Sequence, residues 1–152
     1  MSPWWIHKPF LIGGSNPTEC RLMQVRGEGV NLVISLLDEK TQPLKCPVER
    51  LEAMGFIRHN IPVPDFTPPS IPQILEFLGL VRKIPKGGKI YVHCQAGIGR
   101  TGTMASAYWI SRGLSPEEAV QRVRKNRPFA VETDEQMHIL REFHRIFGTI
   151  FT

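Results

Sequence analysis

The stretch from residue 89 to residue 111 constrains the possible folds most strongly. Lys89–His93 is short and apolar, as in a buried strand, and Arg100–Ser111 is a predicted helix. Two glycines, Gly97 and Gly99, lie in the turn between them. A strand that leads through a tight turn into a helix is the first half of a βαβ unit, whose strands lie parallel in one sheet. The stretch therefore predicts an α/β fold.

Strands and helices alternate along the rest of the chain. Three further segments are short and apolar, which predicts strands: Phe10–Ile12, Val30–Leu36 and Phe56–Ile61. Helices are predicted from Asn16 to Gly27 or Gly29, across residues 47–55, from Ser70 onward, from Ser115 onward, and from Thr133 to about Phe147. The alternation predicts a single domain over residues 1–152, with a central, mostly parallel sheet of four to five strands and helices on both faces.

Short polar motifs predict where the helices begin. Asn16 is the expected N-cap of the first helix, with Pro17 at its first position. Ser70 and Gln73 form a capping box, and Ser115 caps a later helix. Apolar residues at helical spacing then mark the inward faces of these helices and of the last one: Ile74, Leu75, Phe77, Leu78 and Val81; Ala119, Val120 and Val123; Met137, Leu140, Phe143 and Phe147.

Composition narrows the class of protein. The sequence is 41% hydrophobic and 22% charged, which is ordinary for a globular domain, and its net charge of +5 suits an anionic substrate. It has no apolar run long enough to span a membrane, and its first ten residues lack the features of a signal peptide. Its three scattered cysteines do not form a disulfide framework. We therefore expect a cytoplasmic protein, because a thiolate nucleophile needs a reducing compartment. We also expect a monomer.

Cys94 and Arg100 are the candidates for catalysis. Cys94 follows the strand directly, and Arg100 begins the helix. The intervening glycines allow the backbone N–H groups to point inward around an anion, and the helix N-terminus adds positive potential. An arginine can hold two oxygens of one phosphate. A cysteine in such surroundings is a thiolate at neutral pH, so the stretch predicts cleavage of phosphate esters through a phosphocysteine.

Other interpretations of this motif are weaker. Cys20 and Arg26 have the same spacing, but they lie in a predicted helix without intervening glycines. The three glycines from residue 97 to residue 102 also match a dinucleotide-binding fingerprint. That fingerprint expects an acidic residue about twenty residues later, at the end of a strand, whereas the nearest acids here begin a helix. A glycine-rich turn with an inert buried cysteine is the remaining alternative.

A phosphate ester also needs an acid to protonate its leaving oxygen. Asp65 is the best candidate, because it lies on a proline-rich loop after a predicted strand, where α/β proteins place their ligand sites. An aspartate that serves only a turn is the alternative interpretation. Asp38 and Glu39, at the end of another predicted strand, are the runners-up.

Two residues beside the motif are predicted to support it. Thr101 follows the arginine, and its hydroxyl is placed to hydrogen-bond the thiolate or to serve the first turn of the helix. His93 precedes the cysteine, and we expect its ring nitrogens to fix the loop. Cys20 and Cys46 have no assigned role and are interpreted as structural thiols.

Three motifs occur together in one order: His93-Cys94-x5-Arg100-Thr101-Gly102, the preceding Pro64-Asp65-Phe66, and the following residues 132–136, ETDEQ. In this the chain resembles the cysteine-dependent tyrosine phosphatases, and most of all their small dual-specificity members, from about Phe10 to Phe147. The resemblance implies that Cys94 is the nucleophile, that Arg100 binds phosphate, and that Asp65 is first general acid and then base. It also implies a phosphate cradle formed by the backbone of Gln95, Ala96, Gly97, Ile98, Gly99 and Arg100.

Gln136 has two interpretations of equal weight. It matches the water-positioning glutamine of the larger tyrosine phosphatases, and it also completes a capping box with Thr133. Those larger enzymes carry a second glutamine where Glu132 stands, and a tryptophan where Val63 stands. No tyrosine-recognition segment is evident near the N-terminus. This predicts a shallow pocket that accepts phosphoserine and phosphothreonine as well as phosphotyrosine.

The expected partners are therefore phosphorylated proteins, and no metal or cofactor is expected. Phosphoinositides are an alternative, although residues 95–99 carry no lysine to grip further phosphates. RNA 5′ ends are another, to which the basic cluster Arg122, Arg124, Lys125 and Arg127 would contribute, although a solvated helix face is the better interpretation of that cluster. A non-catalytic module that binds phosphoproteins is a third alternative. The joint presence of Cys94, Arg100 and Asp65 argues against it.

Overall fold

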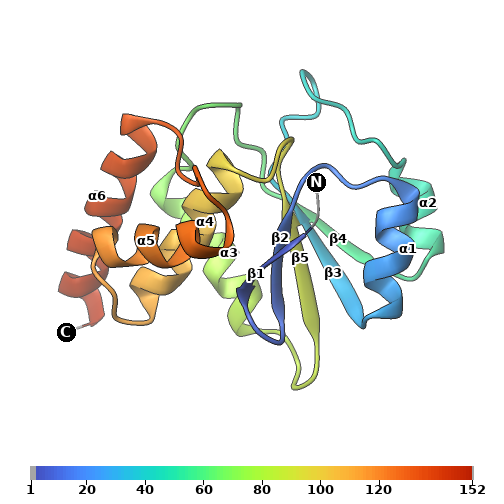
Figure 1. The fold of residues 1–152 in the computed structure, drawn as a ribbon, viewed down its shortest axis with the longest axis horizontal. Helices are drawn as coiled ribbons and strands as arrows, with labels where there is room; N and C mark the ends of the chain where they lie inside the picture. The colour runs from blue at the N-terminus through green and yellow to red at the C-terminus, as the bar shows by residue number, and fades with distance from the viewer. Residues whose placement is uncertain (1–2, 152) are drawn as a thin grey trace.

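A five-stranded sheet forms the centre of the molecule (Figure 1). The computed structural model describes residues 3–151, with side chains described to residue 148. The strands are β1 (Trp4–His7), β2 (Leu11–Gly14), β3 (Val30–Ser35), β4 (Ile57–Asn60) and β5 (Lys89–His93), in the order β1-β2-β5-β3-β4. β1 pairs antiparallel with β2, and the other neighbours are parallel. The mostly parallel sheet is thus confirmed.

Helices cover both faces of this sheet, as expected. They are α1 (Glu19–Gly27), α2 (Val48–Ala53), α3 (Ile71–Arg82), α4 (Gly99–Ser111), α5 (Pro116–Asn126) and α6 (Asp134–Phe151). α1 and α2 lie on one side of the sheet, and α3 to α6 lie on the other (Figure 1). No helix in the described part of the chain is long and apolar enough to cross a membrane.

The core has two parts, one on each face of the sheet. The central strand β5 contributes to both, because successive side chains of a strand point to opposite faces. Ile90 and Val92 pack beneath α3 to α6, and Tyr91 packs beneath α1 and α2. All three side chains are at most 1% exposed. Burial on both faces fixes the position of β5, and therefore the position of the loop that follows it.

The structure corrects three local expectations. β1 was not predicted; it is a four-residue edge strand whose residues alternate between buried and half-buried, and the aromatic Trp5 at a half-buried position hides this alternation in the sequence. α1 begins at Glu19 with Thr18 as its N-cap, so Asn16 is not the cap. Leu75 is 44% exposed, whereas the other predicted inward residues of α3 are buried. The predicted capping boxes at Ser70 and Ser115 are confirmed.

Candidate active site

The parallel strands bring their carboxyl ends together at one edge of the sheet. There Leu36 donates its N–H to the carbonyl of His93 (2.8 Å), and Val63 donates its N–H to the carbonyl of Leu36 (3.1 Å). These bonds join the segments that follow β3, β4 and β5. Because ligands of α/β proteins bind at this edge, the segments after these three strands are the candidate site.

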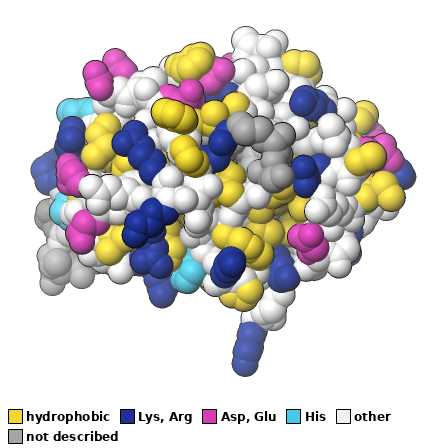
Figure 2. Space-filling view, in the orientation of Figure 1, with side chains coloured by type: hydrophobic (Ala, Val, Ile, Leu, Met, Phe, Trp, Pro, Cys, Tyr) yellow, Lys and Arg dark blue, Asp and Glu magenta, His cyan; other side chains and the backbone are white. Residues whose placement is uncertain are grey.

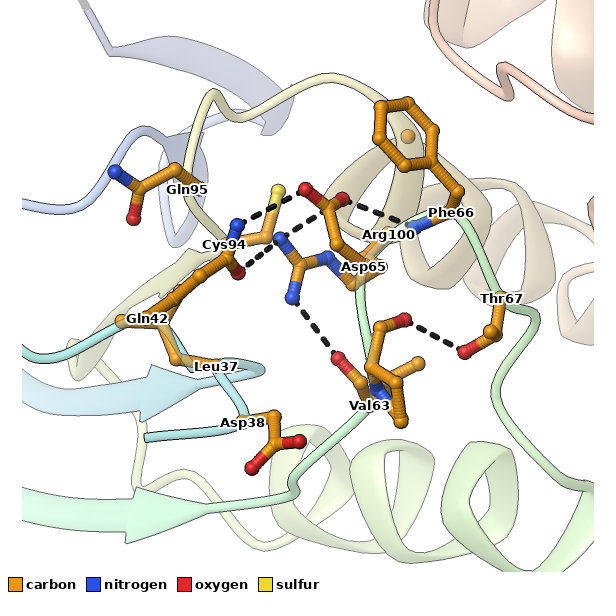
Figure 3. A network of polar contacts seen from close by, with 12 residues as sticks. Leu37, Asp38, Gln42, Val63, Asp65, Phe66, Thr67, Cys94, Gln95 and Arg100 are labelled. Carbon is orange, nitrogen blue, oxygen red and sulfur yellow. Dashed lines mark hydrogen bonds and ion pairs between the residues drawn. The ribbon is translucent and has the colours of Figure 1, made fainter. Parts of the chain in front are cut away.

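Cys94 lies at the centre of this edge, directly after β5. Its side chain is 2% exposed, and its Sγ accepts a hydrogen bond from the backbone N–H of Gly97 (3.3 Å). Figure 3 shows the sulfur and the carboxylate of Asp65 pointing toward the same space. The curled loop thus holds the Cys94 sulfur in a fixed position beside Asp65.

The loop after Cys94 curls because of Gly97. This residue has a φ of 74°, and a Cβ there would lie 2.6 Å from the backbone of Gly14. Its carbonyl points outward and accepts hydrogen bonds from Trp4 Nε1 (3.2 Å) and Arg127 Nε (3.3 Å). β1, β2 and the end of α5 therefore hold the loop in its curled form.

Helix α4 begins within this loop, so its N-terminus faces the site. The first intrahelical bond runs from Gly102 N to Ile98 O (2.8 Å). The preceding N–H groups at a helix start have no partner within the helix, and they carry the positive end of the helix dipole. The loop of residues 95–100, where the family resemblance implies a phosphate cradle, thus leads directly into the start of α4.

Arg100 is held in a buried polar network. It is 2% exposed, and its Nη1 donates to Val63 O (2.9 Å). Its Nη2 contacts Gln42 Oε1 at 2.7 Å and Asp65 Oδ1 at 3.1 Å (Figure 3). Its Nε is buried without a hydrogen-bond partner among the described residues. Nη2 is therefore engaged by two side chains, whereas Nε is engaged by none that the structure describes.

Asp65, and neither runner-up, lies against Arg100. Its Oδ1 accepts the N–H of Phe66 (2.9 Å), whose backbone is left-handed at φ 63°. Glu39 instead pairs with Arg58 (2.7 Å). Asp38 accepts the N–H of Lys40 and points away from Arg100 (Figure 3). The proline-rich loop thus brings one carboxylate to Arg100, as the choice of Asp65 over the runners-up predicted.

Gln42 was missed in the sequence, although it joins the two charged groups. Its Oε1 accepts from Arg100, and its Nε2 donates to Asp65 Oδ2 at 2.9 Å. It follows β3 in the same loop as Asp38, which was weighed as an acid. The sequence did indicate that this polar loop, which follows a buried parallel strand, lies at the ligand-binding edge of the sheet. No sequence motif singled out Gln42 within the loop.

Asn16 was also missed, because it was assigned as a helix cap. Its side chain is 2% exposed and donates to Gln95 Oε1 and to Pro43 O, both at 3.1 Å. Its backbone N–H donates to Gln95 O (3.0 Å), and its Oδ1 accepts the N–H of Lys45 (3.2 Å). Asn16 therefore ties the first residue of the cradle to the loop that carries Gln42.

His93 contacts the loop through one ring nitrogen rather than both, because its Nε2 has no hydrogen-bond partner among the described residues, and Thr101 does not hydrogen-bond the sulfur. Burial lowers the pKa of His93 to about 4, so the ring is neutral near pH 7. Its Nδ1 lies 3.1 Å from the carbonyl of Cys94. A carbonyl only accepts, so Nδ1 carries the proton. Thr101 Oγ1 is buried with no hydrogen-bond partner among the described residues, and the expected bond to Cys94 is not formed.

Gln136 forms the predicted capping box, and its role in positioning water stays a prediction. Its Oε1 accepts the backbone N–H groups of Glu132 (2.7 Å) and Thr133 (3.1 Å), and its own N–H donates to Thr133 Oγ1 (3.0 Å), which completes the capping box. Its Nε2 has no partner among the described residues. This nitrogen lies 3.2 Å from where a Cβ on Gly99 would be, and the Glu132 carboxylate is also against Gly99. One end of the side chain caps α6, while its amide nitrogen lies next to Gly99.

The basic cluster is largely engaged in holding the structure. Arg124 donates to Ala130 O (2.8 Å) and Val131 O (3.0 Å). Arg127 contacts the cradle, and Arg122 stacks on Trp109 at 3.8 Å from the ring centroid. These contacts account for three of its four cations without a nucleic acid.

Cys20, Arg26 and Cys46 belong to the side of the sheet that α1 and α2 cover. Cys20 is exposed on α1, and Arg26 donates to the carbonyls of Met54 (3.1 Å) and Val30 (3.2 Å). Cys46 is buried among the side chains beneath α1 and α2, and burial raises its pKa. The Cys20–Arg26 spacing therefore has no anion site, as its place in a helix predicted.

Comparisons with known proteins point to one family. Residues 10–114 match the family described as "Polymorphic toxin system, DSP-PTPase phosphatase". Human phosphatidylglycerophosphatase and protein-tyrosine phosphatase 1 is 30% identical over 148 residues, which cover 93% of this chain and 74% of the human protein. The crystal structure of Tk-PTP in the active form is similar with a TM-score of 0.86 and 36% identity, over 95% of this chain and 97% of that one.

Another relative is much longer than this chain. Bovine protein tyrosine phosphatase domain-containing protein 1 is 27% identical over 137 residues. The match covers 82% of this chain but 17% of the bovine protein. The chain thus spans less than a fifth of that relative's length.

Proposed function

We propose that this chain, which belongs to the DSP-PTPase phosphatases, hydrolyses phosphotyrosine, and also phosphoserine and phosphothreonine, in proteins. This family is the dual-specificity type of the cysteine-dependent tyrosine phosphatase superfamily. One observation carries the proposal. Cys94 Sγ receives the Gly97 N–H beside an arginine and a carboxylate that contact each other at 3.1 Å. Nucleophile, phosphate ligand and acid thus occupy one small site.

The first half of the reaction transfers the phosphoryl group to sulfur. The Cys94 thiolate attacks phosphorus, an S–P bond forms, and the ester P–O bond breaks. The leaving oxygen takes the bonding electron pair and accepts a proton from Asp65. The N–H groups of residues 95–100 stabilise the charge on the phosphoryl oxygens.

Arg100 couples phosphate binding to the release of the acid. Nε is unpartnered and Nη2 holds Asp65. A phosphate that takes both nitrogens displaces the Asp65 carboxylate from its cation, since the two anions compete for Nη2. The freed Asp65 carboxylate takes up a proton from solvent and then gives it to the leaving oxygen, while Arg100 Nη1 stays anchored on Val63 O.

The second half returns the enzyme to its starting state. Asp65, now a carboxylate, accepts a proton from water as the water oxygen attacks phosphorus. The P–S bond breaks, Cys94 leaves as thiolate, and inorganic phosphate is released. We propose that Gln136 orients that water, since its amide nitrogen lies beside Gly99 without a hydrogen-bond partner among the described residues.

The substrate class rests on the loop and on the relatives. Gln95, Ala96, Gly97, Ile98 and Gly99 add no cation for a second phosphate, which favours a simple phosphomonoester. The bovine relative is by name a protein tyrosine phosphatase domain-containing protein. The human relative is by name also a phosphatidylglycerophosphatase. A phospholipid monoester is therefore the second candidate substrate.

We place the protein in the cytoplasm. All three cysteines are free, and a catalytic thiolate is preserved only in a reducing compartment. Fractionation with a thiol-trapping reagent checks this placement: the Cys94 thiol is expected in the reduced pool.

A substrate panel tests the proposal. It compares kcat/KM for a phosphotyrosine peptide, a phosphothreonine peptide, phosphatidylglycerophosphate vesicles, a phosphoinositide and 5′-triphosphorylated RNA. We expect the phosphotyrosine peptide to be turned over fastest, with inhibition by orthovanadate and no effect of EDTA. Faster turnover of the lipid or of RNA would replace the protein substrate. Binding of the peptides without turnover of any substrate would make the chain a phosphoprotein-binding module.

A further inference from the structure

We propose that the chain has a second binding site, for a single-chain amphipathic anion, in a cavity of about 600 Å³ at the end of the sheet opposite the catalytic loop. The cavity lies where α3 and α4 end, and the turn of residues 85–88 and the Pro9–Phe10 segment close it. In Figure 1 this turn and the loop after β5 lie at opposite ends of that strand. The proposal concerns binding and does not depend on the proposed substrate.

The floor of the cavity is apolar. Leu78 and Val81 are each 6% exposed, and Tyr108 is 5% exposed. Phe10 and Ile84 complete this lining and are only partly buried. The volume lies within the range of natural small-molecule sites, roughly 300–1,000 Å³. An acyl chain can therefore enter between the ends of α3 and α4 and cover apolar surface.

The rim of the cavity is basic. Four of its lining residues are cationic, namely Arg82, Lys86, Lys89 and Arg112, and none is acidic. Lys89 Nζ is engaged with Glu28 O at 2.8 Å. The other three form no ion pair with the described residues. Figure 2 shows Lys and Arg side chains along the lower edge of the molecule, where the turn between α3 and β5 lies in Figure 1.

Helix ends alone do not explain this arrangement. The negative end of a helix dipole favours cations near a C-terminus, which accounts for Arg82 and Arg112 singly. It accounts neither for Lys86, which lies in a turn, nor for the apolar floor between the cations. The positive field also reaches His7, whose pKa is lowered by burial and by Arg112 and Arg122.

The chemistry of the site selects its ligand. A bare anion such as phosphate would leave the apolar floor exposed to water, and a neutral chain would leave the cations without a partner. A ligand with one apolar chain and one terminal carboxylate or phosphate satisfies both parts.

Nuclear magnetic resonance with three matched probes tests the site. Octanoate has both the chain and the charge, octanol has only the chain, and acetate has only the charge. We expect octanoate to shift the amide signals of residues 78–88 and 111–112, and to bind at least about tenfold more tightly than either partial probe. Equal binding of octanol, or shifts confined to residues 95–99, would overturn the proposal.

Charge reversal provides the second test. Arg82→Glu with Arg112→Glu is expected to weaken octanoate binding at least about tenfold, because two attractive charges become repulsive. Lys83→Glu with Lys125→Glu is the matched control, since both residues are exposed and neither lines the cavity. Turnover of p-nitrophenyl phosphate stays unchanged in both double variants and verifies folding. Equal octanoate binding by the two double variants would contradict the proposal.

Discussion

At the residue scale, uncharged side chains hold the reactive ones in place. Gln42 bridges Arg100 and Asp65, and Asn16 ties Gln95 to the neighbouring loop. His93 is kept neutral by burial and contacts the Cys94 carbonyl. Because none of them takes part in bond making, their effects on catalysis act through position.

Gln42→Ala tests the bridge. Hydrogen bonds to charged groups contribute about 1.5–3 kcal/mol, so kcat/KM is expected to fall roughly ten- to a hundredfold. Steady-state kinetics with p-nitrophenyl phosphate measures this, and the urea midpoint is expected to change little. Gln24→Ala is the control, because Gln24 is exposed on α1 and its side chain accepts a hydrogen bond from Arg21, away from Arg100 and Asp65. Equal kcat/KM in the two variants would remove Gln42 from the site.

His93 predicts a pH dependence of stability. Its folded pKa of about 4 lies below the ordinary 6.5, so between these values the unfolded state binds more protons. The contribution of neutral His93 to the free energy of unfolding is complete above pH 6.5 and is lost as the pH falls toward 4. Between about pH 7 and about pH 5 the free energy of unfolding is expected to fall by about 2 kcal/mol.

Urea unfolding of wild type and His93→Asn at these two pH values measures that loss. The asparagine keeps an N–H donor for the Cys94 carbonyl and removes the titration, so the variant is expected to lose less stability on acidification. The pKa of His7 is also lowered, but that residue is present in both proteins and cancels in the difference. The same acid sensitivity in both would show that His93 titrates normally.

At the scale of elements, local sequence rules predicted where helices begin better than they predicted which residues from distant parts of the chain contact each other. The boxes at Ser70 and Ser115 involve residues three apart, so the sequence contains the whole interaction. The bond from Arg100 to Gln42 spans 58 residues, and the bond from Asn16 to Gln95 spans 79. Such pairs depend on which strands become neighbours, and no local pattern encodes that.

The catalytic loop shows why a glycine is required at one position. Gly97→Ala and Gly87→Ala both place a Cβ on left-handed backbone, which costs about 1–2 kcal/mol. A Cβ at Gly87 meets nothing within 4 Å, whereas at Gly97 it meets the backbone of Gly14. We expect Gly97→Ala to lose more unfolding free energy and roughly a hundredfold in kcat/KM. Gly87→Ala retains its activity. Urea unfolding and turnover measure both variants, and equal losses would mean that the loop tolerates a side chain.

At the scale of the whole molecule, the sheet separates two sites. Its carboxyl edge carries Cys94, Arg100 and Asp65, and its opposite edge carries the apolar cavity with a basic rim. The glycine spacing and the acid loop predicted the first site because a nucleophile, a cation and an acid have strict chemical requirements. The second was not predicted, because its lining comes from the ends of elements that are ordinary in sequence.

Turnover by Cys94→Ser is the most direct test of the central claim, that phosphate is transferred to the Cys94 sulfur. A serine hydroxyl is not ionised at neutral pH, so kcat for p-nitrophenyl phosphate is expected to fall at least about a thousandfold. Vanadate binding at the cradle is expected to persist without its bond to sulfur, and Cys20→Ser and Cys46→Ser are expected to retain wild-type turnover. Wild-type turnover by Cys94→Ser, or its loss in Cys20→Ser, would contradict a phosphocysteine at this position.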